Sequence, residues 1–457
     1  MSNNPEKSLD EIIEQREARE EIISTEEALE ISKQEKIWAD EAAALKEKEL
    51  NNVAGKTAFT LDYRADKIAD DHVYAKYEDI DQELLQKDIE DIKENLGPVS
   101  EEDFQHLLKL ERWSKSANYA GAFGLFATVA LEATSGLAGF SFWFLAILSA
   151  ILIGVGNVTR WADITHPVLH GAYDKVPNIP RQYTKKHYAR GNNRYFHWLD
   201  WIKPEAWEYE HNIMHHYHLG EDDDPDNVEK NLQWLINSSA PLFAKRMVVY
   251  LFAMVWKFIY YAPNTMRILD NKERRRRKEP ETTKYHFFPT TSTGKKLWKE
   301  SYLPYGLVRF VAMPLLLLPL GWTAVGSAFL IILMAEAYAN LHSFLVIVPN
   351  HSAGDIYQFS EPHKSQGEFY LRQIMGSVNY NTGTDLLDFT QGFLNYQIEH
   401  HLFPNTPQSY QQKMQPLVKE VCRKHNIEYR QESVWTRIEK TVDMMIGKDK
   451  APKVASI

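Results

Sequence analysis

The stretch NYAGAFGLFATVALEATSGLAGFSFWFLAILSAILIGVGNVT, residues 118–159, decides the fold class, because Glu132 is its only charged residue. A second stretch of the same kind, residues 303–349, carries only Arg309 and Glu336 as charges. A membrane-spanning helix needs about 20 apolar residues, so each stretch is long enough for two such helices. We therefore expect an all-α integral membrane protein with four transmembrane helices arranged in two hairpins.

The charges outside these stretches predict the orientation of the hairpins. The turns expected near residues 134–139 and 319–324 contain no Lys or Arg, whereas the connecting residues 160–299 are rich in both. Basic residues collect on the cytoplasmic side of membrane proteins. The sequence therefore predicts a multi-pass integral membrane protein whose connector, termini and active site all lie on the cytoplasmic side.

A shorter apolar segment, residues 247–257, tests this topology. Lys257 interrupts it, and a third crossing here would place the histidines that follow it on the opposite side from those before it. We expect this segment to be an interfacial helix that lies along the membrane surface.

The composition excludes several other classes of protein. The net charge of −10 over 457 residues argues against nucleic acid as a partner. The single cysteine, Cys422, excludes an intramolecular disulfide and a thiolate-rich metal site. No apolar segment follows a basic N-terminal start, so we expect no cleaved signal peptide. Residues 1–112 are charged and read as a cytoplasmic helical region, and residues 411–457 as a cytoplasmic tail.

Eight histidines gather in three short clusters and one single site, all outside the apolar stretches but close to their ends. They are His166 and His170, then His211, His215 and His216, then His351 alone, and finally His400 and His401. A spacing of four residues places two rings on one face of a helix. Many imidazoles at the edge of a bilayer are costly unless a metal holds them neutral. Eight rings exceed the four ligands of one zinc ion, so we expect two metals, and oxygen chemistry on a lipid favours iron.

These three motifs, His166-xxx-His170, His211-xxx-His215-His216 and Gln397-xx-His400-His401, resemble the histidine boxes of membrane fatty acid desaturases. The run NYQIEHHLFP, residues 395–404, is especially similar to the front-end and acyl-lipid branch. The resemblance covers roughly residues 113–410, which it identifies as a desaturase domain. It implies four spanning helices below a cytosolic helical cap that holds a di-iron site. It also implies that His351 is a further ligand after the fourth span.

The resemblance implies an oxygen-dependent fatty acyl desaturase that uses dioxygen as co-substrate and acts on an acyl lipid or an acyl thioester. The His-Pro-Gly-Gly motif of a fused cytochrome b5 domain is absent from the sequence. We therefore expect a separate electron donor, of the ferredoxin or cytochrome b5 type. A related di-iron lipid or hydrocarbon hydroxylase is the alternative, because both reactions begin with the same hydrogen abstraction. A metal-handling membrane protein without turnover is a third hypothesis.

Other polar residues near the motifs have less specific interpretations. Gln397 and His218 are candidates for orienting a ligand or a water, and His342 for packing within the fourth span. Glu336 is expected to pair with Arg309 or with the backbone. Acidic side chains that could orient metal-bound rings are Asp163, Glu210, Asp222, Asp223, Asp224, Asp226, Asp385, Asp388 and Glu399.

Overall fold

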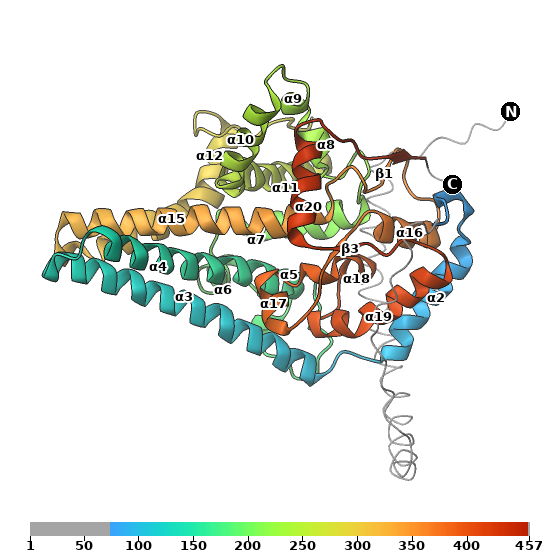
Figure 1. Ribbon diagram of the computed structural model, residues 1–457, viewed down its shortest axis with the longest axis horizontal. Helices are drawn as coiled ribbons and strands as arrows, with labels where there is room; N and C mark the ends of the chain where they lie inside the picture. The colour runs from blue at the N-terminus through green and yellow to red at the C-terminus, as the bar shows by residue number, and fades with distance from the viewer. Residues whose placement is uncertain (1–73, 456–457) are drawn as a thin grey trace, which may run out of the picture. The chain divides into compact units, whose positions relative to one another are not determined.

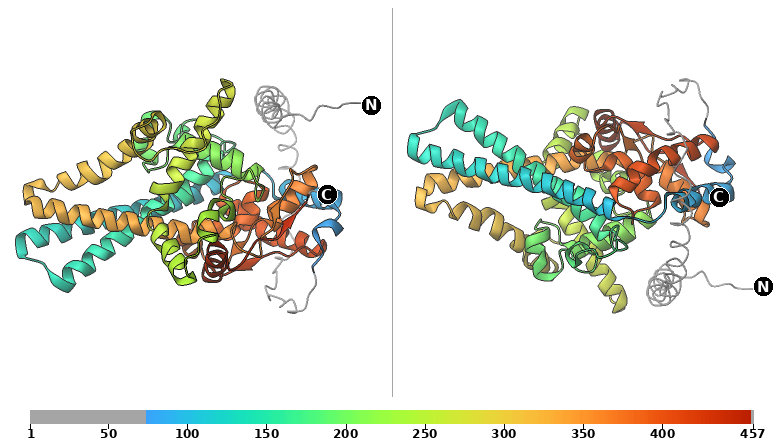
Figure 2. Two further views of the ribbon diagram at one scale, coloured as in Figure 1. Left: turned by 90° about the horizontal axis from the view of Figure 1, so that it is seen from above. Right: turned by 90° about the horizontal axis from the view of Figure 1, so that it is seen from below.

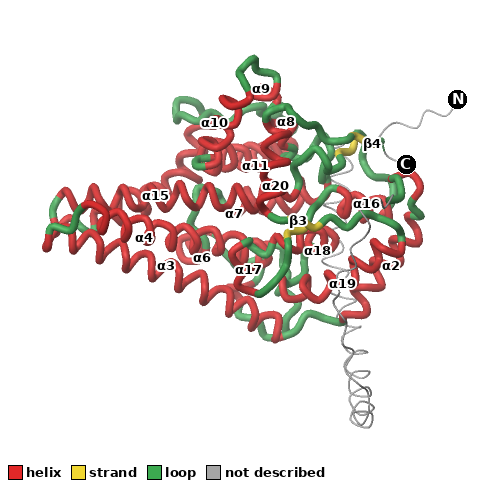
Figure 3. The backbone as a smooth tube through the Cα atoms, viewed as in Figure 1, coloured by secondary structure: helices red, strands yellow, loops and turns green. Residues whose placement is uncertain are grey.

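The computed structural model describes residues 74–455, so the helices expected before residue 74 lie outside the described part of the chain. The described residues belong to one compact unit that begins at Tyr74. As the sequence indicates, this unit is mostly helical (Figure 3), and its few strands belong to the C-terminal half of the chain.

The long helices lie side by side and extend away from the remaining elements (Figure 1). They are α3 (Glu101–Ser135), α4 (Gly139–Thr159) and α15 (Trp322–Ile347), together with a segmented helix made of α12 (Ser292–Leu297), η7 (Trp298–Tyr302), α13 (Leu303–Gly306), η8 (Leu307–Ala312), α14 (Met313–Leu315) and η9 (Leu318–Leu320).

The other elements form a helical cap at one end of the long helices. Before α15 they are η1 (Tyr77–Asp79), α2 (Gln82–Leu96), η2 (Arg160–Thr165), α5 (His166–Leu169), η3 (Arg181–Tyr183), η4 (Gly191–Asn193), α6 (Arg194–His197), α7 (Pro204–Glu208), η5 (Tyr209–His215), α8 (Val228–Asn231), α9 (Gln233–Ile236), α10 (Leu242–Ala253), η6 (Lys257–Tyr261) and α11 (Ala262–Arg276). After α15 they are η10 (Val348–Asn350), β1 (Gln358–Phe359), α16 (Gln366–Met375), β2 (Asn379–Tyr380), α17 (Asp385–Thr390), η11 (Leu394–Tyr396), α18 (Gln397–Leu402), α19 (Gln408–Lys424), β3 (Gln431–Glu432), α20 (Val434–Met445) and β4 (Lys453–Val454).

The helices α3 and α4 form an antiparallel pair whose turn falls where the sequence indicates. A capping box between Ser100 and Asp103 starts α3, and Gly136, with φ of 67°, ends it in the left-handed conformation. Within the pair, a Cβ at Gly121 would lie 2.6 Å from the backbone nitrogen of Ile153. The missing side chain therefore lets the two backbones approach closely.

Three helices of the described part are long and apolar enough to cross a membrane: Gly139–Leu169, Ser292–Leu320 and Trp322–Asn350. The second and third of these form an antiparallel pair that turns at Gly321, where φ is 100° (Figure 2). The helix α3 is long enough but is not among the three, and its N-terminal half is charged. Four spans in two membrane-crossing hairpins therefore remain a proposal.

The C-terminal residues pack into the cap. Met414, Val418 and Cys422 of α19 are buried against α2 and α16. The strands β1 and β4 pair in parallel, as do β2 and β3, which ties the chain end to the segment after α15. The C-terminal segment therefore belongs to the same compact unit as the rest of the described chain.

The carboxylate of Glu336 in α15 lies among neutral donors and not against Arg309. Trp201 Nε1 donates to Glu336 Oε1 over 2.8 Å, and the Tyr305 hydroxyl donates to Oε2 over 2.5 Å. Lys257 Nζ is 3.9 Å away and makes its closer ion pair, at 2.9 Å, with another carboxylate, that of Asp200. The expected pairing with Arg309 is wrong because the neutral donors of Trp201, Tyr305 and Asn340 hydrogen-bond to the carboxylate instead.

Candidate metal centre

The eight histidines come from four separate segments of the cap. His166 and His170 lie at the start and end of α5, which continues α4 through the π-helical segment η2. His211 and His215 lie in the π-helical segment η5, and His216 follows it. His351 follows η10 at the end of α15, and His400 and His401 lie in α18. The structure gathers all eight rings into two neighbouring groups.

The first group contains four rings whose Nε2 atoms form a closed quadrilateral. The Nε2 of His166 is 2.9 Å from that of His400 and 3.0 Å from that of His211. The Nε2 of His216 is 3.1 Å from His400 and 3.3 Å from His211. All four rings therefore direct the same ring nitrogen toward one point.

His170 is the fifth member of this group. Its ring centroid is 4.7 to 5.2 Å from those of His216, His400, His166 and His211. Its Nε2 is buried and has no hydrogen-bond partner among the described residues. A buried ring nitrogen without a partner is costly, so His170 has the environment expected of a metal ligand.

These separations fit a bound metal ion. A metal–nitrogen bond of about 2.1 Å places two ligands at right angles about 3.0 Å apart. The four Nε2–Nε2 distances, 2.9 to 3.3 Å, match this value. Neutral nitrogen donors of this kind suit iron, zinc and copper better than magnesium or calcium. The five residues therefore fit a transition-metal ion.

The second group contains His215, His351 and His401, whose ring centroids are 4.5 to 5.2 Å apart. Gln397 contacts this group, since its Nε2 is 2.7 Å from the Nε2 of His351. The Gln397 Oε1 is buried without a partner among the described residues. Asp226 forms a further candidate group with His211 and His215.

The two sequence-adjacent pairs divide their rings between the groups. His216 and His400 belong to the first group, while His215 and His401 belong to the second. Neighbours on an α-helix point about 100° apart, so one adjacent pair can serve two sites side by side. The rings of His216 and His401 stack at 4.2 Å, which shows that the two groups are in contact.

The π-helical segment η5 changes the pairing that the spacing indicates. His211 and His215, four residues apart, are stacked at 5.4 Å and lie in different groups of imidazoles. His211 instead joins His216, five residues away, in the first group. A π-helix bonds residue i to residue i+5, which places such a pair on one face. His211 and His215 also lie close enough to form a candidate group with Asp226, so the i, i+4 spacing describes one of the two pairings that His211 makes.

The other ring nitrogen, Nδ1, is held by partners outside the two groups. The Nδ1 of His215 donates to Asp224 Oδ1 over 3.0 Å, and that of His351 donates to the carbonyl of Gly376 over 3.2 Å. The Nδ1 of His401 is 2.9 Å from Gln373 Oε1. Such bonds fix the tautomer with Nε2 free to bind a metal. A lone glutamine carries no sequence signal, which is why the contact of Gln373 was not expected.

Burial and mutual repulsion hold the rings neutral. Burial lowers the pKa of His170, His211, His216, His351, His400 and His401 well below the ordinary value, and neighbouring histidines lower it further. Burial also lowers the pKa of His215, but Asp224 outweighs it and leaves this pKa raised. Neutral rings offer the lone pair that a metal requires.

Of the acidic candidates, Asp224 is the one that contacts a ring of the two groups at hydrogen-bond distance. Glu399 accepts hydrogen bonds from Asn379 and Tyr429, and Asp385 forms an ion pair with Lys109. The partners of these two carboxylates are therefore residues outside the two histidine groups. His218 also lies outside both groups, since its Nδ1 is 2.9 Å from Glu221.

Of the remaining acidic side chains, some are buried and others lie at the surface. Asp163 and Asp388 are buried, and Tyr396 donates to Asp388. Both carboxylate oxygens of Asp163 lack a hydrogen-bond partner among the described residues. Glu210 accepts from Tyr261, while Asp222 and Asp223 lie at the surface.

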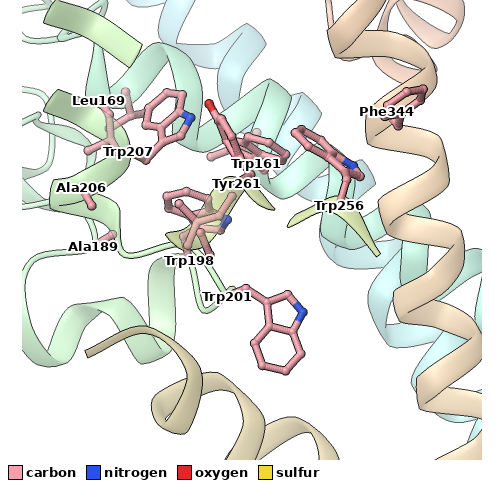
Figure 4. Packing of buried hydrophobic residues seen from close by; sticks show 14 of the residues in the cluster. Trp161, Leu169, Ala189, Trp198, Trp201, Ala206, Trp207, Trp256, Tyr261 and Phe344 are labelled. Carbon is pink, nitrogen blue, oxygen red and sulfur yellow. The ribbon is translucent and has the colours of Figure 1, made fainter. Parts of the chain in front are cut away.

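A cavity of about 150 Å³ opens beside the histidines. His166, His211, His215 and His351 line one side of it. Its other walls are mainly apolar and aromatic, and Figure 4 shows part of this packing. The aromatic residues of these walls are Trp161, Trp207, Trp234, Phe252, Trp256, Tyr260, Tyr261 and Phe344. Apolar walls around a few converging polar groups are typical of a site for an apolar ligand.

Comparison with known proteins agrees with this geometry. Residues 141–433 match the sequence model of the fatty acid desaturase family. The chain is 26% identical over 297 residues to an NADPH-dependent stearoyl-CoA 9-desaturase of Mycobacterium tuberculosis, a match that covers 61% of this chain and 62% of that protein.

Two further relatives come from other organisms. An acyl-lipid (7-3)-desaturase of Rebecca salina is 27% identical over 322 residues, covering 67% of this chain and 65% of that protein. A Delta(5) fatty acid desaturase A of Dictyostelium discoideum is 24% identical over 231 residues, 49% of this chain and 48% of that protein. The chain thus spans less than two thirds of the length of these relatives. Because the family match extends over more than half of the sequence, the chain belongs to the fatty acid desaturase family.

Proposed function

We propose that the chain is an oxygen-dependent fatty acyl desaturase that introduces a C=C double bond into an acyl chain. The observation that carries this proposal is the pair of contacting imidazole groups beside an apolar cavity. The names of the relatives, which include a stearoyl-CoA desaturase and an acyl-lipid desaturase, support the same reaction class.

In this proposal two iron ions are held by the eight histidines. The first group, His166, His170, His211, His216 and His400, holds one ion. The second group, His215, His351 and His401, holds the other, with Gln397 next to it as a residue that orients a ligand or a water. When bound, iron supplies the activation of dioxygen and the oxidising power for removing hydrogen from an unactivated methylene.

The overall reaction balances as one acyl CH₂–CH₂ unit, one dioxygen, two electrons and two protons giving one CH=CH unit and two waters. The two electrons come from a separate donor of the ferredoxin or cytochrome b5 type. The chain's own residues contribute position: the aromatic walls, including Trp161, Trp207 and Tyr261, exclude water and fix which carbons lie beside the histidines.

The membrane arrangement completes the proposal. We propose four spanning helices, α3 with the three apolar helices, and a cap and both termini on the cytoplasmic side. The desaturase domain is taken as residues 113–410, between the region 1–112 and the segment 411–457.

The test is expression in a host of known lipid content, followed by mass spectrometry of its fatty acids. The expected result is a new unsaturated acyl chain that disappears in the His216→Ala variant while the variant still inserts into the membrane. An oxygenated chain without unsaturation would identify the hydroxylase instead, and metal exchange without dioxygen consumption would identify a metal-handling protein.

A further inference from the structure

The helix α10 exposes most of its apolar residues and buries the charged Lys245. Its outward side chains are apolar or aromatic: Leu242, Phe243, Met247, Val248, Tyr250 and Leu251 are all exposed, Phe243 by 73%. A helix on a water-facing surface has the opposite pattern. The outward face of α10 therefore requires an apolar environment.

The two charged residues of α10 are turned toward the protein. Lys245 is buried, and its Nζ donates to the carbonyls of Ile236 over 2.7 Å and Ile446 over 3.4 Å. Arg246 forms an ion pair with Asp443 of α20. Both basic side chains of α10 thus have partners within the protein.

The position of α10 identifies what covers it. Phe252 of α10 contacts Phe344 of α15, with ring centroids 6.5 Å apart. Phe344 lies six residues before Asn350, the end of an apolar helix long enough to span a membrane, or about 9 Å along the helix axis. The exposed face of α10 is thus continuous with the end of a membrane-spanning segment, where an interfacial helix lies.

The cavity beside the histidines reaches the surface next to this face. Leu232, Trp234 and Phe252 are among the residues that line it, and Trp234 is 62% exposed. Trp234 lies in α9, whose C-terminal carbonyl at Ile236 is held by Lys245 of α10. Residues of both α9 and α10 therefore line the cavity, and the exposed Trp234 marks where its lining meets the surface.

Among the described residues that line this cavity there is no Lys or Arg, and Asp226 is the one formally charged side chain. A soluble acyl thioester bears several phosphates on its carrier, and phosphates are recognised by Arg and Lys. The lining therefore offers an acyl chain apolar contacts but offers a polyphosphate carrier no cationic partner.

We infer that the substrate is an acyl chain of a bilayer lipid, which enters the cavity sideways between α9 and α10, past Trp234. This inference rests on the proposed desaturase function and names its substrate class. The lipid head group stays at the membrane surface, and the outward face of α10 anchors the mouth at that depth.

The first experiment compares two presentations of the same labelled acyl chain to the purified, iron-loaded protein in nanodiscs, with an external reductant. One is phosphatidylcholine within the nanodisc, and the other is the soluble acyl-CoA. We expect unsaturation of the lipid at a rate at least about tenfold above that of the acyl-CoA. A faster reaction of the acyl-CoA overturns the inference and leaves the desaturase function standing, whereas no double bond in either overturns the proposed function itself.

A matched pair of variants tests the role of α10. Met247→Glu combined with Leu251→Glu places two carboxylates on its outward face, and Leu417→Glu places one on the exposed side of α19 as the control. The α10 variant should lose about tenfold or more of the lipid rate while keeping wild-type iron content. Equal lipid rates for the two variants would contradict the inference.

A measurement without turnover tests the same point. A nitroxide at Leu251→Cys should be relaxed more by dioxygen than by a water-soluble nickel complex, and one at Leu417→Cys should show the reverse. The native Cys422 is buried and does not compete for the label. Stronger relaxation by the nickel complex at residue 251 would show that this face lies in water and would overturn the inference.

Discussion

Replacing Gln373 with leucine should weaken metal binding although Gln373 belongs to neither histidine group. Its Oε1 is 2.9 Å from the Nδ1 of His401, and its Nε2 is 3.4 Å from the backbone carbonyl of His216. One side chain of α16 thereby contacts residues of both groups. Leucine fills a similar volume but offers His401 no hydrogen-bond acceptor.

The magnitude follows from the burial of this contact. Gln373 and His401 are 2% and 1% exposed, so water cannot replace the lost acceptor. A buried donor left without a partner costs about 1–3 kcal/mol. Loss of a residue that orients a metal-bound histidine typically lowers metal affinity about 10–100-fold, which is of the same order. We therefore expect a 10–100-fold loss, mainly of the ion held by the second group, which contains His401.

The assay is iron content per chain after dialysis against a graded series of chelator concentrations. The Gln373→Glu variant is the matched control, because its carboxylate still accepts from His401 and should restore most of the affinity. Wild-type iron retention by Gln373→Leu, or equal losses in both variants, would refute the argument that this acceptor orients the ring.

Three further predictions address stability, selectivity and pH. Lys257→Met removes the ion-pair partner of the buried Asp200 carboxylate and should lower the free energy of unfolding by about 3–5 kcal/mol. The double variant Lys257→Met/Asp200→Asn should recover part of this loss, as measured by thermal unfolding in detergent. Equal unfolding midpoints for wild type and Lys257→Met would contradict this prediction. Trp256→Ala removes an indole from the cavity wall and should change the chain length or double-bond position of the product, as read by mass spectrometry; an unchanged product profile would show that Trp256 does not limit the cavity. Most of the clustered rings have lowered pKa values, so the unfolded metal-free chain takes up protons that the folded chain does not. The stability of the folded, metal-free protein should therefore fall as the pH drops below about 6.5, while His215, whose pKa is raised, opposes this trend. A melting temperature that stays constant between pH 7.5 and pH 5.5 would contradict this prediction.

Much of the architecture follows from hydrophobic patterning. The apolar stretches predict the long helices and their turns, because the length of an apolar run and a glycine such as Gly136 or Gly321 are local signals. The same signal does not separate the two halves of α3, since its charged N-terminal half continues directly into an apolar half. The partners of Glu336 were not predictable, because Trp201 and Tyr305 reach it from distant segments.

The candidate site shows the same division between local and distant signals. Histidine spacing indicates the three clusters, the resemblance adds His351, and the structure brings all eight rings together. It does not indicate how they divide, because the π-helical turn that joins His211 to His216 has no recognised sequence pattern. Likewise the contact between Gln373 and His401 joins residues 28 positions apart and depends on how α16 packs.

The most direct test of the account is the number of iron atoms per chain in the purified protein, measured by mass spectrometry of the metal. The account predicts two iron atoms per chain, because two contacting groups of neutral imidazoles share the eight rings. A chain that contains no iron after expression in iron-replete cells would contradict it.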